Sequence, residues 1–475
     1  MSISESISSK WLYAISKRTV HKRTAEAFIF VSTRKKVYGV LGLTAMLVSG
    51  FATPAYAAST VTVYKDTTYQ TIWGFGAAAN HPVNELKTGY NATVQGQILD
   101  TLFRTDNSNA GLSIVRLEVN PYTSAQDSVQ TTFMPSDGVL DWNTDLHQRW
   151  FAQEAKNRGT NQFYAVPWSP PGWMKDNGSP NNGGHLKSTH YDKYANYLKT
   201  YVNYYRNTLG FNIKWLSVQN EPDLSTPYAS AQYTISEMNT VAAKVADSIH
   251  SLNQGVLVGG PEGSNRSASN NYIINLSTAT RDKLDFLSVH DYSTYTDVST
   301  YGKPLMSTEV SDFQNPNDPS ITDGLKWGNM IASDLKRGEK GWLYWWAVNP
   351  ASSTTGEGLI NLLGNNTFSV NKRLYVMGQF SRYLRPDDTR ILASSSDSNI
   401  VSIAGKNATG RAAVVLINNS SSSITMTISG LTFANVSGRR TSATENLAKL
   451  SDIAVSGGAI TVTLPGKSVT SYTEY

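Results

Sequence analysis

The sequence predicts an α/β protein, a (β/α)8 TIM barrel fused to a C-terminal β-sandwich. Eight short apolar runs recur between residues 72 and 348, and segments of helical character separate them. Eight strands that alternate with helices are typical of the closed parallel barrel. From about residue 394 onward, Ser, Thr, Asn and Gly become frequent and strand-like runs dominate. A chain of 475 residues is long enough to form both parts.

The eight apolar runs are the expected barrel strands. They are Ile72–Ala77, Leu112–Leu117, Phe163–Trp168, Ile213–Val218, Val256–Gly260, Leu284–Val289, Pro304–Val310 and Gly341–Val348. Amphipathic stretches between them, such as Tyr191–Thr208 and Ala231–Leu252, are expected helices. We therefore expect the barrel to cover residues 72–385.

The β-sandwich is expected over residues 386–475. Its strand-like runs are Ile400–Ala404, Arg411–Asn418, Ser423–Ile428, Ile460–Leu464 and Ser468–Tyr472. The segment 58–71 begins with alternating polar and apolar residues, as a half-buried strand does. We expect this N-terminal strand to pair into the sandwich.

Residues 1–57 have the pattern of a secretory signal peptide. The basic residues Arg34, Lys35 and Lys36 precede the apolar segment Val37–Phe51, and Ala55-Tyr56-Ala57 then matches a signal-peptidase site, so we expect cleavage after Ala57. The stretch before Arg34 is long and polar, which indicates either an extended leader or a translation start downstream of Met1. A membrane anchor is the alternative, but the apolar core is short for a membrane span.

Composition narrows the classes of function. The absence of cysteine excludes disulfides, thiolate metal sites and a cysteine nucleophile. The leader holds eight of the 41 Lys and Arg and two of the 36 Asp and Glu, which leaves 33 basic and 34 acidic residues and removes the main support for a nucleic-acid partner. A signal peptide without cysteines fits an extracellular bacterial protein. We expect a monomer with no membrane association after cleavage.

Two glutamates follow predicted strands at matched positions. Glu221 stands in Asn220-Glu221-Pro222 after the fourth run, and Glu309 lies near the end of the seventh. Catalytic residues of parallel barrels lie at strand ends, and paired carboxylates are the machinery of glycosidases. We predict that Glu221 is the acid/base and Glu309 the nucleophile of a retaining enzyme, and that Asn220 binds the sugar 2-hydroxyl. The alternative for either glutamate is a buried ion pair or an exposed edge residue.

Other polar residues of the strands are candidates for supporting roles. Arg116 lies inside an apolar run and needs a carboxylate partner, so we predict that it orients Glu309 and keeps it ionised; the alternative is a structural salt bridge with Glu118 or another acid. Tyr292 could donate a hydrogen bond to the nucleophile or pack as a rim aromatic. His290 is a candidate substrate contact.

Two motifs are not interpreted as separate sites. The pair His290-Asp291 does not indicate a metal site or a serine-type triad, because no second suitably placed histidine and no Gly-x-Ser-x-Gly elbow accompanies it. Gly74-Phe75-Gly76 lacks the third glycine and the following helix of a nucleotide loop, so we interpret it as a tight strand end. Glu262, after the fifth run, is expected to support the site rather than to catalyse.

Four tryptophans at strand ends are candidate sugar contacts. Trp168 is a candidate wall of the pocket and Trp173 a platform, while Trp345 and Trp346 would form an aromatic floor. The Pro170-Pro171 pair makes the turn around the first two rigid. Packing in the core is the alternative for each tryptophan.

The ordered motifs of residues 74–386 resemble those of glycoside hydrolase family 30. The matching pieces are Gly74-Phe75-Gly76 with Asn80-His81-Pro82, Trp168-Ser169-Pro170-Pro171-Gly172-Trp173-Met174-Lys175, Ser217-Val218-Gln219-Asn220-Glu221-Pro222, Ser307-Thr308-Glu309-Val310, Lys372-Arg373, Gly378-Gln379-Phe380-Ser381-Arg382-Tyr383 and Arg385-Pro386. The resemblance implies a retaining mechanism without metal or other cofactor, a barrel fused to a β-sandwich, and catalysis by Glu221 and Glu309. The Asn-His-Pro and Trp-Ser-Pro-Pro pieces are most similar to bacterial endo-xylanases, including glucuronoxylanases.

Two departures from that pattern bear on the substrate. Glucuronoxylanases carry basic residues just after the last strand, whereas Ala347–Ser353 contains no Arg or Lys. Val83 and Asn84 follow Asn-His-Pro, where the xylanases of the family often have an aromatic residue. We therefore expect an endo-β-1,4-xylanase without strict dependence on glucuronate, whose partner is a plant cell-wall polysaccharide.

Three alternatives remain open. The first is an endo-β-1,6-galactanase or β-1,6-glucanase of the same family. The second is a non-catalytic carbohydrate-binding protein, against which intact Glu221, Glu309 and Arg116 argue. The third is that the β-sandwich itself binds polysaccharide, although it contains no tryptophan.

Overall fold

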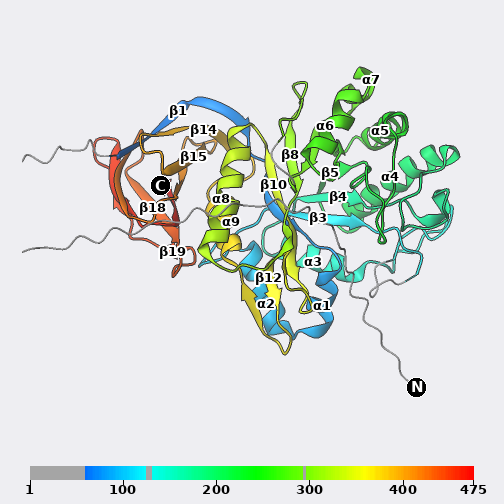
Figure 1. Cartoon of the computed structure of the whole chain (residues 1–475), viewed down its shortest axis with the longest axis horizontal. Helices are drawn as coiled ribbons and strands as arrows, with labels where there is room; N and C mark the ends of the chain where they lie inside the picture. Colours follow the sequence, from blue (N-terminus) through cyan, green and yellow to red (C-terminus); the bar gives the residue numbers. More distant parts are fainter. Residues whose placement is uncertain (1–58, 125–130, 293–295) are drawn as a thin grey trace, which may run out of the picture. The chain divides into compact units, whose positions relative to one another are not determined.

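The computed structural model describes residues 59–124, 131–292 and 296–475. Two ten-stranded sheets organise this part of the chain, one in the barrel and one in the sandwich (Figure 1). The predicted signal peptide lies outside the described residues. No described helix is both long enough and apolar enough to cross a membrane.

The predicted eight-stranded parallel barrel is confirmed. Neighbouring strands pair in parallel in chain order, and the last strand pairs with both the first and the seventh, which closes the barrel. The strands are β2 (Gly74–Ala78), β3 (Ile114–Val119), β4 (Phe163–Pro167), β5 (Ile213–Ser217), β6 (Leu257–Pro261), β7 (Phe286–His290), β8 (Leu305–Glu309) and β10 (Gly341–Asn349). The ends of the predicted runs differ from these bounds by at most two residues.

Helices lie between most of the barrel strands, and most of these helices bury apolar side chains against the core. They are α1 (Pro82–Gly89), α2 (Ala92–Phe103), α3 (Leu146–Asn157), α4 (Tyr191–Asn207), α5 (Ile235–His250), α6 (Arg266–Asn275), α7 (Thr278–Lys283), α8 (Ile321–Lys336) and α9 (Lys372–Ser381). Two short 3-10 turns, η1 (Gly172–Met174) and η2 (Ser188–His190), precede α4. Helix α5 starts later than the predicted Ala231 because Thr234 and Glu237 form a capping box that fixes its first turn.

The motif Gly74-Phe75-Gly76 forms the first three residues of β2. A Cβ atom on Gly76 would lie 2.1 Å from the carbonyl oxygen of Ile114 on β3. The glycine therefore permits the close approach of two neighbouring barrel strands, and the motif has a packing role rather than a nucleotide-binding one.

Short strands add to the barrel beside β10. Strands β12 (Gly358–Leu362) and β13 (Phe368–Val370) extend the sheet from β10. Strands β9 (Asp312–Pro316) and β11 (Thr355–Gly356) form a separate antiparallel pair. Strand β8 ends at Glu309, and β10 contains Trp345. The β9–β11 pair therefore joins the loop that follows β8 to the loop that follows β10.

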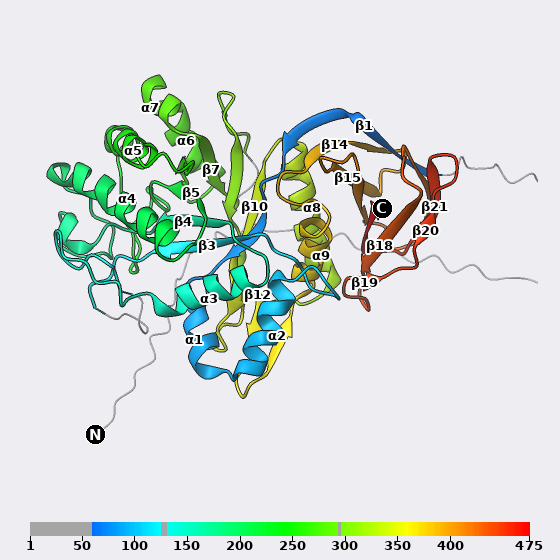
Figure 2. The ribbon, with the colours of Figure 1, turned by 180° about the vertical axis from the view of Figure 1, so that it is seen from behind.

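The N-terminal strand belongs to the sandwich, as expected. Strand β1 (Ser59–Thr71) pairs antiparallel with β14 and parallel with β17, and Figures 1 and 2 both show it along β14. The remaining strands are β14 (Thr389–Ser395), β15 (Ile400–Lys406), β16 (Ala412–Asn418), β17 (Ile424–Ser429), β18 (Asn435–Thr441), β19 (Ala448–Lys449), β20 (Ile453–Ala454), β21 (Ala459–Leu464) and β22 (Ser468–Glu474). The sequence prediction missed β18 because the segment Asn435–Thr441 is mostly polar.

Polar contacts join the sandwich to the last two helices of the barrel. Ser471 Oγ donates to the carbonyl oxygen of Gln379 on α9 at 3.0 Å, and Asn329 Nδ2 on α8 donates to Asn419 Oδ1 at 2.8 Å. The sandwich therefore packs on α8 and α9, and the catalytic candidates lie on the barrel strands.

Candidate active site

The two predicted catalytic glutamates lie close together at the barrel mouth. Glu309 is the last residue of β8, and Glu221 lies four residues after β5. One carboxylate oxygen of each and one ring nitrogen of His290 all lie within 4.8 Å of one another. Glu221 has a left-handed backbone with φ of 43°, and its N–H donates to the carbonyl oxygen of Glu262 at 2.9 Å. Unusual backbone of this kind in a non-glycine residue is common at functional sites.

Both carboxylate oxygens of Glu309 are held in place. Arg116 Nη1 donates to Oε2 at 2.5 Å, and the Tyr292 hydroxyl donates to Oε1 at 2.8 Å. These are the contacts expected of residues that orient a nucleophile. Burial raises the pKa of Glu309, and the positive charges of His290 and Arg116 and the Tyr292 hydrogen bond act to lower it.

Arg116 lies at the centre of the buried network. Its Nη2 group donates to Asn220 Oδ1 at 2.7 Å and to Glu262 Oε1 at 3.0 Å. The alternative partner Glu118 instead accepts a hydrogen bond from Asn80. The side chain is fully buried, and its two acidic partners keep the pKa of the guanidinium above its usual value despite the desolvation.

Glu262 and His290 complete the network beneath the catalytic pair. Burial would raise the pKa of Glu262, but Arg116 and His290 together lower it to about 2. His290 Nδ1 lies 3.0 Å from Glu221 Oε1, and its Nε2 lies 3.4 Å from Glu262 Oε1. Burial would lower the pKa of His290, but Glu309, Glu221 and Glu262 raise it to about 10. Glu262 therefore pairs with the two cations, as expected of a supporting residue.

The spacing of Glu221, His290 and Glu309 would also suit a metal ion. The protonation of the site argues against that use. A histidine with a pKa of about 10 holds both ring protons at neutral pH and offers no lone pair to a metal. Arg116 and Tyr292 already occupy the two oxygens of Glu309. The arrangement instead provides one ionised carboxylate held by donors beside a second carboxyl group.

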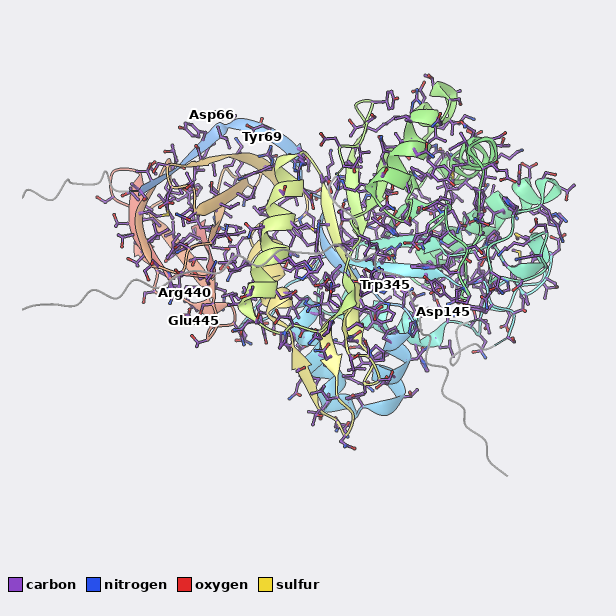
Figure 3. The ribbon with its side chains drawn as sticks, in the orientation of Figure 1. Asp66, Tyr69, Asp145, Trp345, Arg440 and Glu445 are labelled. Carbon is purple, nitrogen blue, oxygen red and sulfur yellow. The ribbon has the colours of Figure 1, made fainter. Side chains whose placement is uncertain are left out.

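Two of the predicted tryptophans adjoin this network. The rings of Trp168 and Trp345 lie 5.6 Å apart, and the Arg116 guanidinium lies 4.5 Å from the Trp168 ring centre and 5.7 Å from that of Trp345. Trp168 is 6% exposed, so it packs behind Arg116 more than it lines a pocket. Trp345, marked in Figure 3, is partly exposed and offers more ring surface to a ligand.

Trp346 and Trp173 do not offer the sugar-binding surfaces that were predicted for them. Trp346 stacks on Trp345 at 5.3 Å but is only 8% exposed, so it supports the floor from below. Trp173 is not brought to the carboxylates in the described part of the chain. Its indole nitrogen donates to the carbonyl oxygen of Met134, and its ring contacts His190, because the turn after Pro171 directs it toward the helix α4 side.

Sequence reasoning missed several side chains at the mouth. Phe313 on β9 is 43% exposed, and its ring meets that of Tyr292 edge to face at 5.2 Å. Tyr228, in the loop after Glu221, is 53% exposed and lies within electrostatic reach of Glu221, Glu309 and Glu357. No spacing rule points to these residues, because loop pairings such as β9 with β11 bring them to the site.

Comparisons with known proteins identify a family that matches both parts of this chain. The family described as "O-Glycosyl hydrolase family 30" matches residues 58–263, and the "Glycosyl hydrolase family 30 beta sandwich domain" matches residues 389–472. The glucuronoxylanase XynC of Bacillus subtilis (strain 168) is 27% identical over 453 residues, which cover 90% of this chain and 95% of the relative. The endo-1,6-beta-D-glucanase neg1 of Aspergillus fumigatus is 24% identical, over 88% of this chain and 93% of the relative.

A solved structure with the same two-part fold is also similar to this chain. The catalytic domain of the GH30 xylanase C from Talaromyces cellulolyticus superposes with a TM-score of 0.77 at 27% identity, covering 88% of this chain and all of that domain. The two family matches fall in order on the barrel and on the sandwich. This protein therefore belongs to glycoside hydrolase family 30 and is a glycoside hydrolase.

Proposed function

We propose that this protein is a secreted, retaining endo-β-1,4-xylanase that does not depend strictly on glucuronate. The observation that carries the mechanism is the carboxylate spacing, because an oxygen of Glu221 lies within 4.8 Å of one of Glu309. Retaining enzymes hold their two carboxyl groups about 5–5.5 Å apart, whereas inverting enzymes leave about 6.5–9.5 Å for a water molecule.

In the first step, Glu309 attacks the anomeric carbon and forms a glycosyl ester. Glu221 donates its proton to the glycosidic oxygen as the bond to the anomeric carbon breaks, and the free end of the chain departs. Arg116 and Tyr292 hold the two Glu309 oxygens, which fixes the direction of attack. His290 holds Glu221 Oε1, which leaves Oε2 to face the leaving oxygen.

In the second step, the ionised Glu221 takes a proton from water. The water oxygen attacks the anomeric carbon, the ester bond breaks, and Glu309 leaves as a carboxylate. Asn220 Oδ1 accepts from Arg116, so the amide N–H groups of Asn220 are the donors available to the sugar 2-hydroxyl. Trp345 supplies an apolar ring face for the sugar.

The substrate assignment rests on the relatives and on the mouth of the barrel. The relatives named as xylanases cover nearly the whole of this chain. Residues 347–353 contain no Arg or Lys to bind a glucuronate carboxylate. Secretion rests on the leader sequence of residues 1–57.

The second candidate is a β-1,6-glycanase. The likeness to the endo-1,6-beta-D-glucanase of Aspergillus fumigatus favours β-1,6-glucan over β-1,6-galactan as that alternative substrate. The same two glutamates would serve either linkage, because the mechanism acts on the anomeric carbon and does not depend on which hydroxyl of the next sugar leaves.

Product analysis on a polysaccharide panel tests the proposal. The chain without residues 1–57 is incubated with glucuronoxylan, arabinoxylan, unsubstituted xylan, β-1,6-galactan and β-1,6-glucan, with Glu309→Gln as the inactive control. We expect xylo-oligosaccharides from substituted and plain xylans, and proton NMR of the first product should show the β-anomer. Cleavage of only a β-1,6 polymer would overturn the substrate assignment, and an initial α-anomer would overturn the retaining mechanism.

A further inference from the structure

One carboxylate at the barrel mouth has no part in this mechanism. Glu357 is the single residue between β11 and β12. Strand β11 pairs with β9, and the backbone N–H of Trp346 donates to the Glu357 carbonyl oxygen at 3.1 Å. The backbone therefore fixes Glu357 between the loop that follows Glu309 and the strand that carries the tryptophan floor.

The side chain of Glu357 is held in one orientation. Thr355 Oγ1 donates to Glu357 Oε2 at 2.5 Å. Burial raises the pKa of Glu357, and Thr355 and the nearby Trp345 side chain act to lower it. The backbone places Glu357 beside the tryptophan floor, because Trp346 pairs with Gly358, the next residue, and donates its N–H to the Glu357 carbonyl oxygen. A sugar stacked on the Trp345 ring would have its hydroxyls within reach of Glu357.

The charge of Glu357 acts on the Tyr228 phenol together with the charges of the catalytic pair. Burial and the negative charges of Glu221, Glu309 and Glu357 raise the pKa of the Tyr228 phenol to about 12. The half-exposed Tyr228 phenol therefore interacts electrostatically with all three carboxylates. No lysine, arginine or histidine in the described part of the chain pairs with Glu357.

The charge of the cleft follows from these contacts. Beneath the cleft, two cations, Arg116 and His290, face Glu262 and Glu309. The two positive charges of Arg116 and His290 equal the two negative charges of Glu262 and Glu309, so the negative charges of Glu221 and Glu357 are additional. Above its raised pKa, Glu357 therefore adds an uncompensated negative charge beside the ring that would bind the sugar, and a substrate carboxylate placed there would meet repulsion.

We infer that Glu357 and Trp345 form a subsite that accepts the hydroxyls of a neutral sugar and disfavours a carboxylate-bearing substituent. The inference rests on the proposed function and names the substrate class within it. It goes beyond the absence of a basic residue in 347–353, because it assigns a side chain that acts against the acidic substituent.

The isosteric variant Glu357→Gln tests this subsite. It keeps an oxygen that can accept from Thr355 and Trp345, and it removes only the charge. We would measure kcat/KM on linear xylo-oligosaccharides and on the same oligosaccharides carrying one glucuronate branch. We expect the acidic-to-neutral ratio to rise about tenfold in the variant. Raising the salt concentration from about 0.05 to 0.5 M should raise the ratio in the wild type and leave it unchanged in the variant. A ratio within twofold of the wild type would overturn the inference.

Two further variants keep the test decisive. Glu154→Gln removes an equal charge from the outer helix α3 and should leave the ratio unchanged. If Glu357→Gln does not fold, Thr355→Val removes the hydroxyl that orients the carboxylate and should raise the ratio by about threefold; no change in a folded Thr355→Val would then contradict the inference.

Failure of the proposed function gives a different result from failure of this inference. If the wild type cleaves only a β-1,6-glucan, the xylan assignment fails. The same variants are then compared on that glucan and on its carboxylated derivative. An unchanged ratio there overturns the subsite, and a tenfold rise supports it on the corrected substrate.

Discussion

The hydrogen bond from Tyr292 to Glu309 makes a sharp prediction about pH dependence. The Tyr292 hydroxyl donates to Glu309 Oε1 at 2.8 Å, and this bond stabilises the ionised carboxylate. Tyr292→Phe removes the hydroxyl and keeps the ring that packs against Phe313 and His290. Glu309 must be ionised to attack, so activity is lost as the pH falls through its pKa, and the variant should lose activity at a higher pH.

The size of the shift follows from the strength of the bond. A hydrogen bond to a charged group contributes about 1.5–3 kcal/mol, and one pKa unit corresponds to about 1.4 kcal/mol. Arg116 still holds the other oxygen, so we expect the smaller part of that range. The acid limb of kcat/KM should move upward by about 1 pH unit, on top of the upward shift that burial already causes.

The assay is a pH–rate profile on a soluble oligosaccharide between pH 3 and 9. Tyr197→Phe is the control, because it removes a buried tyrosine hydroxyl that donates to the carbonyl oxygen of Asn120 rather than to a carboxylate. The reasoning is refuted if the acid limb of Tyr292→Phe stays in place or moves downward, or if Tyr197→Phe shifts it equally.

Three further outcomes are expected at other positions. Burial raises the pKa of Glu118 from an ordinary 4.5 to about 7, so its contribution to the free energy of unfolding falls by ~3 kcal/mol between pH 4.5 and 7. Thermal melts of Glu118→Gln should lack that slope, and curves parallel to the wild type would contradict it. Lys65 pairs with the buried Glu474, whose pKa is lowered, so Lys65→Met should cost ~2 kcal/mol in urea unfolding at pH 7. The loss should shrink in acid, as the pH falls through the lowered pKa of Glu474, and an equal loss in strong acid would argue against the ion pair. Phe313→Ala should lower kcat/KM on polysaccharide about fivefold with an unchanged melting temperature, and a large drop in melting temperature would show a structural role instead.

The barrel and the catalytic pair could be predicted from the sequence, because both depend on local sequence patterns. Each barrel strand is a short apolar run, and a helix follows every one of the first seven except β7 in the described part of the chain. Glu221 and Glu309 stood out because they follow two such runs, and parallel strands bring their ends to one mouth. Arg116 stood out because a charge inside an apolar run must find a buried partner.

The remainder depends on pairings that no local pattern encodes. The sequence predicted Glu309 as the partner of Arg116 and left Glu118 or another acid as the alternative, since strand tilt and side-chain packing decide which carboxylates it reaches. Trp173 and Trp345 are alike as residues at strand ends, and only the turn after Pro171 separates their surroundings. Glu357 lies in a polar stretch and reaches the cleft through the pairing of β9 with β11.

The central claim is that Glu309 is the nucleophile of a retaining enzyme. It is tested most directly by trapping the glycosyl-enzyme with a 2-fluoro-xylobioside that carries a good leaving group, followed by peptide mass spectrometry. The account predicts one added 2-fluoro-xylobiosyl group, on the peptide that contains Glu309, and none in Glu309→Gln. A label on Glu221 or Glu262, or turnover without any covalent intermediate, would contradict it.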